Sequence, residues 1–321
     1  MSIAVSGDYY GAGSGTEAYA GKFIPVLWSG KLQVKFYQST VLSAITNNDW
    51  EGEIKDTGDK VTIRTIPSIT ISTYSKGLAL TSQVPSAAVV ELLIDNGRYF
   101  QVVVDDVDDI QSDLKLMDIF TNDASQQMKI SIDTAVLLGI KNLAHASNQG
   151  ATAGVLSANV ALGDGNAGDG SATLASVQLT KSNVVEKIVG MGQVLDESNV
   201  PETGRWLVIP AWMGALIKQS DLKDASITGD SQTPMRNGRL GQIDRFTLYV
   251  SNLLPKVSAN TTLGGTYVYA GTNDAITFAS QITKVESLRS TATFGNIVRG
   301  LNVFGYKVIK PEALVQGFFY Q

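Results

Sequence analysis

Strand-like alternation dominates the pattern of apolar and polar residues in the first third of the chain. Apolar and polar positions alternate over 61–66 and 69–74, and again over 89–94 and 99–104. Such alternation is typical of half-buried strands. The polar stretch 75–85 separates the two pairs and predicts one long hairpin, with arms of about 15 residues that reach roughly 50 Å. A lone two-stranded hairpin is marginally stable in water, so we expect this one to lie on another surface.

The pattern changes to that of a helix at Asp105. Apolar residues then recur mostly at steps of three or four, as on one face of an amphipathic helix. Four aspartates lie between positions 105 and 109, in the first turn, where the helix dipole favours carboxylates. The pattern predicts a long helix over 105–146.

Shorter elements are predicted in the second half of the chain. Residues 147–180 are rich in Gly, Ala, Ser and Thr, which predicts a long surface loop or a small inserted hairpin. The remaining pattern predicts helices over 182–198 and 211–219, and strands over 205–210, 246–250, 267–270, 276–279 and 303–309. A long hairpin, a long helix and a mixed second half together predict an α+β fold.

Composition and net charge limit the classes of protein to which this chain can belong. Of 321 residues, 44% are hydrophobic and 17% are charged, against roughly 25% charged residues in an average soluble chain. This balance suits a protein that covers much of its surface with copies of itself. The net charge of −5 argues against a protein that neutralises nucleic-acid phosphates.

The absence of cysteine excludes disulfides, thiolate metal sites and cysteine nucleophiles. The first residues lack the basic and apolar regions of a signal peptide. No apolar run approaches the roughly 20 residues of a membrane span. We therefore expect no membrane association.

Few residues are suited to catalysis or to ligand binding. The single histidine, His145, excludes zinc sites built from clustered histidines. Residues 163–168 match the pattern G-x-G-x-x-G, but they lack the preceding strand and following helix that a dinucleotide site needs. The aspartates at 105–109 lack the spacing of a calcium loop. We expect no catalytic residue, no cofactor and no metal.

The order of these parts resembles the major capsid proteins of tailed bacteriophages, which share the HK-ninety-seven-like fold. The resemblance extends from about Phe23 to Leu314, and the order and spacing of several short stretches carry it. These stretches are Phe23-x-Pro25-x-x-Trp28-Ser29, Gly58-Asp59-x-Val61-x-Ile63, Ile94-Asp95-x-x-x-Tyr99-Phe100, Val104-Asp105-Asp106-Val107, Ser251-Asn252-x-Leu254-Pro255, Ala275-Ile276-Thr277-Phe278-Ala279-x-Gln281 and Phe294-Gly295-x-x-x-Arg299-Gly300-Leu301.

The resemblance implies a division of the chain into the parts of a capsid subunit. Residues 1–49 would form an N-terminal arm and the start of a peripheral domain, and 50–104 an extended loop built as a long β-hairpin. Residues 105–146 would form the spine helix, and 147–180 a loop or small insertion. An axial domain would span 181–280, and 281–321 would return to the peripheral domain and end the chain.

The resemblance also implies a function, that of a structural, non-enzymatic protein. The chain would assemble with itself into pentamers and hexamers that form an icosahedral shell around double-stranded DNA, without sequence recognition. Only 22 residues precede Phe23, which implies a separate scaffolding protein or none; a portal protein would be a further partner. The protein would reside in the virion and assemble in the host cytoplasm.

Contacts between subunits are expected at the arm, the hairpin and the base of the hairpin. The candidates are Trp28, Trp50, Arg64, Tyr74, Lys76 and Arg98. By position alone, Lys76 is also a candidate for the lysine–asparagine cross-link known in part of the family. Two alternatives stay open: an encapsulin-like nanocompartment shell, and a phage tail or surface-layer protein, which would have many even strands and no long helix.

Overall fold

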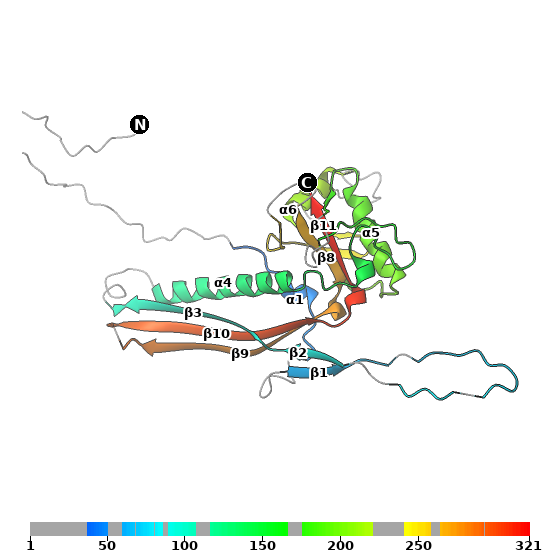
Figure 1. Ribbon diagram of the computed structural model, residues 1–321. Coiled ribbons are helices and arrows are strands. Elements are labelled where there is room, and N and C mark those ends of the chain that lie inside the picture. The colour runs from blue at the N-terminus through cyan, green and yellow to red at the C-terminus, as the bar shows by residue number, and fades with distance from the viewer. Residues whose placement is uncertain are drawn as a thin grey trace, which may run out of the picture.

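The computed structural model of the chain describes residues 37–50, 60–67, 69–79, 81–85, 89–106, 116–165, 175–220, 241–257, 264–291 and 293–321. Figure 1 shows an elongated half, built on one long helix and a narrow sheet, beside a rounded half built on a larger sheet. A loop projects away from both halves at the end nearest their junction.

The elongated half consists of three antiparallel strands and the helix α4 (Leu116–Gly139). The strands are β3 (Asn96–Asp105), β9 (Ile276–Arg289) and β10 (Gly295–Val308), in the order β3-β10-β9. Even-numbered positions of β3 face α4: Val104 is buried, and Arg98 Nε donates to Ser131 Oγ of α4 at 3.2 Å. Because side chains alternate along a strand, the odd-numbered positions lie on the other, open face.

The rounded half contains a six-stranded sheet in the order β4-β11-β8-β5-β7-β6. Its strands are β4 (Val177–Gln178), β5 (Arg205–Ile209), β6 (Gln242–Ile243), β7 (Phe246–Val250), β8 (Thr266–Thr272) and β11 (Leu314–Tyr320). The helices α5 (Val184–Glu197) and α6 (Ala211–Gln219) belong to this half. All five residues of β5 are buried, as expected of a central strand covered on both faces.

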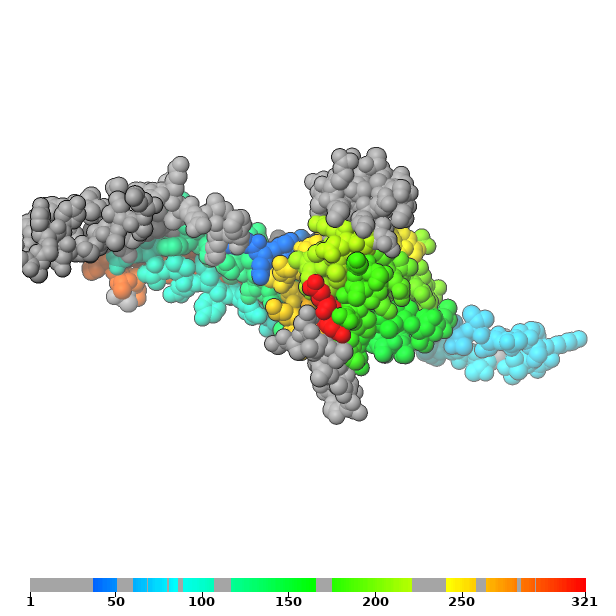
Figure 2. Space-filling model, turned by 90° about the horizontal axis from the view of Figure 1, so that it is seen from above, coloured from blue at the N-terminus to red at the C-terminus, as the bar shows by residue number. Residues whose placement is uncertain are grey.

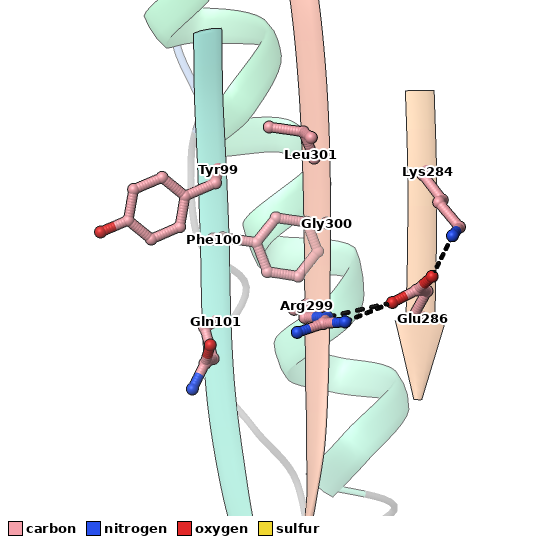
Figure 3. Close-up of a pocket in the computed structure, with 8 residues that line it drawn as sticks. All are labelled: Tyr99, Phe100, Gln101, Lys284, Glu286, Arg299, Gly300 and Leu301. Carbon is pink, nitrogen blue, oxygen red and sulfur yellow. Dashed lines mark hydrogen bonds and ion pairs between the residues drawn. The ribbon is translucent and has the colours of Figure 1, made fainter. Parts of the chain in front are cut away.

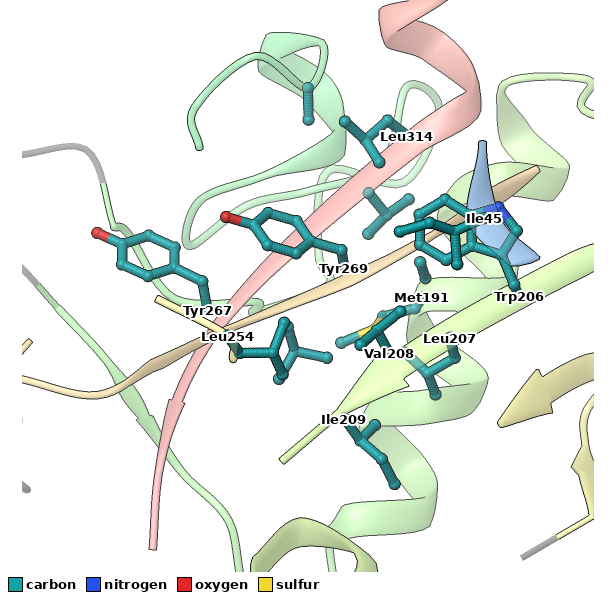
Figure 4. Packing of buried hydrophobic residues seen from close by; sticks show 14 of the residues in the cluster. Ile45, Met191, Trp206, Leu207, Val208, Ile209, Leu254, Tyr267, Tyr269 and Leu314 are labelled. Atoms are coloured by element: carbon teal, nitrogen blue, oxygen red, sulfur yellow. The ribbon is translucent and has the colours of Figure 1, made fainter. Parts of the chain in front are cut away.

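The core is continuous between the two halves. Figure 4 shows Trp206, Val208 and Tyr269 packed together from neighbouring strands, with Ile45 beside Trp206. Tyr269 Oη donates to the backbone carbonyl of Leu137 in α4 at 3.1 Å. Burial raises the pKa of Tyr269 above its usual range, so its hydroxyl stays protonated and available as a donor.

A buried carboxylate fixes the place where the chain enters the body. The short helix α1 (Leu42–Ile45) begins where Asp133 Oδ2 of α4 accepts the backbone N–H groups of Val41 and Leu42, at 2.6 and 3.2 Å. Burial raises the pKa of Asp133, although both hydrogen bonds act to lower it. The carboxylate satisfies two donors that a helix start leaves without partners inside the helix.

Several predicted elements are confirmed. The helix predicted over 211–219 and the strand predicted over 246–250 match α6 and β7 residue for residue. The strand predicted over 205–210 is β5, and the helix predicted over 182–198 is α5. Each carries its signal within its own sequence: apolar residues at helical spacing in α5 and α6, and β-branched or aromatic residues in β5 and β7.

The prediction of a single hairpin over 50–104 is wrong in two respects. Only β1 (Lys60–Arg64) and β2 (Val89–Leu93) pair with each other, whereas β3 pairs with β10. The described residues of 65–85 contain no strand. Alternation shows that a stretch suits a sheet but does not identify its partner, and the segment beyond β1 has no neighbouring strand in the described part of the chain.

The predicted helix over 105–146 begins close to the expected position but ends earlier. Asp105 is the last residue of β3 and Asp106 is helical, whereas α4 ends at Gly139, a few residues before Asn142 adopts a left-handed backbone with φ 59°. Gly139 lies against the Tyr306 ring so closely that a Cβ atom would collide with it. This packing explains why a glycine occupies the last position of the helix. Residues 107–115 lie outside the described part.

The segment 281–321, predicted to return to the peripheral domain and end the chain, divides between the two halves. Its first part, up to Val308, lies in the three-stranded sheet, whereas the last strand lies in the rounded half. β11 pairs with β8 and β4 inside the six-stranded sheet, and Phe318 and Phe319 are fully buried. The described parts of 147–180, predicted as a surface loop or a small inserted hairpin, include hairpin-like pairing, because Ala153 and Val160 exchange backbone hydrogen bonds at 2.8 and 3.0 Å. They differ from a surface loop, because Val160, Leu162 and Leu179 join the core. The Gly-, Ala- and Ser-rich composition of the segment concealed this burial, although Val160-Ala161-Leu162 is a short apolar run.

Candidate assembly surface

The projecting segment, residues 65–85, is the most exposed apolar part of the described chain. Ile66, Ile71 and Val84 are 95%, 89% and 93% exposed. Figure 1 shows the segment reaching beyond the body, and Figure 2 shows it standing clear from a second direction. Large exposed apolar patches mark interaction sites in soluble proteins.

Local hydrogen bonds give the projecting segment its narrow, doubled-back shape. The Gln83 side chain accepts the N–H of Thr70 at 3.1 Å and donates to its carbonyl at 2.7 Å, as a paired strand would. At the tip, Leu78 N donates to Ser75 O at 3.0 Å, and Gly77 takes φ 88°, a value that favours glycine. The segment therefore has a defined shape. Its exposed apolar residues, among them Ile66, Ile71 and Val84, are called the apolar strip below.

The root of this segment is the pair of strands β1 and β2, which packs against β9. Ile63 of β1 and Leu92 of β2 are buried against Ala279 of β9, and the half-buried Trp50 packs on the same cluster. The exposed Lys60 and Glu91 pair across the two strands at 3.0 Å. Because the root is anchored and the tip is not, the segment can bridge to a second molecule.

The open face of the three-stranded sheet is the second exposed surface. It carries Tyr99, 80% exposed, with Val103 and Leu301 beside it at 49% and 41%. A shallow hollow of about 410 Å³ lies here, as Figure 3 shows. Its lining residues are Tyr99, Phe100, Gln101, Lys284, Glu286, Arg299, Gly300 and Leu301.

An ion cluster crosses this face. Glu286 of β9 pairs with Lys284 and accepts from Arg299 Nη2 of β10 at 2.7 Å. Hydrogen bonds from Lys284 and Arg299 lower the pKa of Glu286. Figure 3 shows both cations turned toward this carboxylate. The open face thus offers apolar area around a satisfied polar centre, an arrangement that suits a protein partner.

The six predicted contact residues fall in different places. Tyr74, 68% exposed, and Lys76 lie on the projecting segment, and Arg64 is exposed at the end of β1. Trp50 and Arg98 are held by their own chain, against the root cluster and against α4. Trp28 lies outside the described residues. A role of these residues between subunits stays a prediction.

Sequence reasoning missed the open sheet face. Alternation over 99–104 already placed Tyr99 and Val103 on one side of a strand, but their use in a separate sheet with β10 was not foreseen. The alternation over 99–104 was therefore the sequence signal from which the open face could have been inferred.

Among the described residues, those that were candidates for chemistry do not come together in a site. His145 Nδ1 accepts the N–H of Ser147 at 3.3 Å in a short turn, beyond the end of α4. Arg289 Nη1 donates to Asp106 at 3.2 Å. Of the G-x-G-x-x-G stretch, 163–165 are described and form part of a loop.

No group of three or more His, Asp or Glu side chains in the described parts of the chain is placed to hold a metal ion. No helix in these parts has both the length and the apolar character needed to cross a bilayer.

Comparisons with known proteins point in one direction. A family model described as "Phage capsid protein" matches residues 92–317. A chain of Mycobacterium phage Che8 superposes with a TM-score of 0.73 and 25% identity, covering 92% of this chain and 97% of that one. The capsid of the cyanophage P-SCSP1u gives a TM-score of 0.68 and 15% identity, covering 93% and 94%.

A further capsid structure is similar over nearly the whole chain. The capsid of a native GTA particle gives a TM-score of 0.62 at 14% identity, covering 95% of this chain and 98% of that one. A search of curated proteins finds no match. The predicted HK-ninety-seven-like capsid fold is confirmed by these structures.

Proposed function

Because the chain belongs to the phage capsid protein family, we propose that it assembles into pentamers and hexamers that close into an icosahedral shell. Membership makes it a structural protein of the virion capsid, not an enzyme. The projecting segment 65–85 is the single observation that carries the proposal. It exposes apolar residues on a shaped strip that has no partner surface on the described parts of its own chain.

The halves of the structure correspond to the parts of a capsid subunit in this proposal. The three-stranded sheet with α4 acts as the peripheral domain, and the six-stranded sheet with α5 and α6 as the axial domain. Residues 60–93 act as the extended loop. The C-terminal strand β11 thus belongs to the axial domain in this assignment.

The projecting segment lies across the open sheet face of the next copy in this proposal. Its apolar strip meets a face whose Tyr99 and Leu301 are exposed. The two surfaces differ, so the contact is heterologous, and a heterologous contact that closes generates a ring. Arg64, Tyr74 and Lys76 then lie at or near the contact, as predicted for residues between subunits.

Double-stranded DNA fills the shell without sequence recognition in this proposal. The net charge of −5 provides no basic excess to condense the genome. Packaging therefore depends on other components: a portal, and a scaffolding protein where one is used. Assembly takes place in the host cytoplasm.

Of the alternatives, a tail or surface-layer protein was expected to lack a long helix, whereas α4 has 24 residues. An encapsulin-like shell shares the fold, but the family match is to phage capsid proteins. No described feature favours either alternative.

The test replaces residues 76–85 with a short Gly-Ser turn. The subunit should keep its circular dichroism and melting temperature, because these residues add nothing to the described core. Shells should disappear from sedimentation profiles and electron micrographs, since a closed shell repeats each lost contact many times.

The matched control is Leu143→Ser, which changes an apolar residue that is 45% exposed outside both surfaces. This variant should assemble like the wild type. Normal shells from the turn variant would show that the segment is not the bridge between subunits. Unfolding of that variant would place the segment in the subunit core instead.

A further inference from the structure

A second exposed apolar tip lies in the rounded half. Val155 and Leu156 are adjacent in the chain and 52% and 82% exposed. They occupy a loop beside α5, whose outer face carries Val189, 47% exposed. A leucine with most of its surface in water contributes little to the stability of its own fold.

The loop is held rigidly in spite of this exposure. Glu197 Oε2 accepts the N–H groups of Leu156 and Ser157 at 2.8 and 3.0 Å. Gln193 Nε2 donates to Glu197 Oε1 at 2.8 Å and to Ser157 Oγ at 3.2 Å. A helix therefore supplies two side chains whose bonds position the apolar tip.

The backbone of the loop is also constrained. Gly154 takes φ 112°, and a Cβ atom there would lie 2.5 Å from Ser157 Oγ. Ala158 takes φ 47°, a left-handed conformation that is uncommon for alanine. Strained backbone held by surrounding bonds is concentrated at functional sites. A preorganised tip binds with less loss of conformational entropy than a mobile one.

The tip lies on the side of the rounded half past which the projecting segment reaches. Figure 1 places α5 and its neighbouring loop on that side of the rounded half, and α6 on the opposite side. If the projecting segment reaches the next copy in a ring, the tip faces the same copy. The flank of the next copy that meets the tip is then the flank that carries α6.

The outer face of α6 is suited to receive an apolar tip. Ala211 and Ala215 are exposed, one turn apart, and Trp212 beside them is half-buried. Small residues next to an aromatic ring leave room for a leucine side chain. Aromatic residues of this kind are enriched at the centres of protein interfaces.

We propose that residues 155–156 form an apolar knob that packs on the outer face of α6 in the next copy of the chain. The inference rests on the proposed assembly into rings. The contact joins opposite flanks of the axial half and is heterologous, so it repeats around a closed ring. Glu197 acts as a positioning residue that sets the direction of the knob.

Cross-linking tests the contact directly, because the chain contains no cysteine of its own. Assembled particles of the full-length variant Leu156→Cys/Ala215→Cys are treated with a short bismaleimide and run on a denaturing gel. The contact predicts a ladder of linked subunits. The matched pair Leu143→Cys/Ala215→Cys should give single subunits. Particles of the first variant that yield no ladder would overturn the proposal.

Leu156→Asp provides the second measurement. The subunit should melt like the wild type, and the yield of shells should fall at least about tenfold, because the lost contact is repeated around each ring. Leu143→Asp should leave the yield unchanged. Normal shells from folded Leu156→Asp would overturn the proposal, and if this variant fails to fold, the cross-linking result decides.

The outcomes separate this inference from the proposed function. If the wild-type chain, with any scaffolding protein it requires, builds no shells, the proposed function fails. If wild-type shells form but the cysteine pair is not linked, only the knob is wrong.

Discussion

The fully buried guanidinium of Arg205 holds the connection between α5 and β5. It donates to the carbonyls of Val200 and Pro201 at 2.7 and 2.9 Å, and its Nη2 pairs with Asp196 at 2.7 Å. Arg245 binds the other oxygen of Asp196 at 2.8 Å. These bonds tie the end of α5 to the start of β5 and to the β6–β7 turn.

Arg205→Ala should therefore destabilise the subunit by about 3 kcal/mol, since it leaves buried carbonyls without a donor. Arg299→Ala is the matched control, because that side chain is 52% exposed in its pair with Glu286. It should cost less than about 1 kcal/mol. Urea unfolding of dissociated subunits measures both changes. Equal losses would contradict the role given to Arg205.

Glu197 predicts a pH dependence. Hydrogen bonds, foremost from the N–H of Ser157 and then from Gln193, lower the pKa of its carboxyl from 4.5 to about 2. A depressed pKa means that the ionised group stabilises the fold above pH 4.5, and that this contribution is lost as the pH falls toward about 2.

Glu197→Gln should lower the melting temperature at neutral pH, and the difference from wild type should shrink as the pH falls below 4.5. Glu186→Gln is the control, because the Glu186 side chain is 74% exposed. Calorimetry across this pH range measures the differences. A gap for Glu197→Gln that is independent of pH would contradict the assigned hydrogen bonds.

Residue roles of this kind were beyond sequence reasoning. Nothing in the spacing of Glu197 and Leu156 indicates that one holds the other, because a helix and a loop 41 positions apart meet only in the fold. The exposed Tyr74 and Lys76 were accessible to prediction, since a polar tip between apolar arms is a local pattern.

At the scale of elements, alternation in β2 assigns different roles to adjacent leucines. Leu92 is fully buried in the root cluster, and Leu93 is 46% exposed. Leu92→Ala should loosen the root by about 2–4 kcal/mol. Leu93→Ala should change it by less than about 1 kcal/mol.

Amide hydrogen exchange in β1 and β2 is the appropriate measurement, because the root is a satellite cluster that can open without global unfolding. Faster exchange in Leu92→Ala alone is expected. Equal protection in both variants would show that Leu92 and Leu93 do not lie on opposite faces of β2.

The types of the elements could be predicted better than their partners. Periodicity identified α5, α6, β5 and β7, because each carries its signal within its own sequence. The pairing of β3 with β10 joins residues about 200 positions apart, and no local pattern encodes such a contact. The C-terminal end of α4 lies where Gly139 packs against Tyr306, a contact that is equally nonlocal.

At the scale of the whole molecule, the shape explains the composition. A chain with 17% charged residues leaves apolar strips on its projecting segment, its open sheet face and the tip at 155–156. Each strip on its own is small, and the proposed shell would cover all of them at once. The order of parts predicted the capsid fold from sequence, and the polar tip between apolar arms indicated the projecting segment, whereas the open sheet face and the tip at 155–156 became visible only in the structure.

Neighbouring copies in the proposed shell form rings through the projecting segment, and cryo-electron microscopy of the assembled wild-type particle can show this contact. We expect closed shells with rings of five and six copies, and density for residues 65–85 across the open β3-β10-β9 face of the adjacent copy. A particle in which this segment folds back on its own subunit, or a protein that forms only open aggregates, would rule out this assembly.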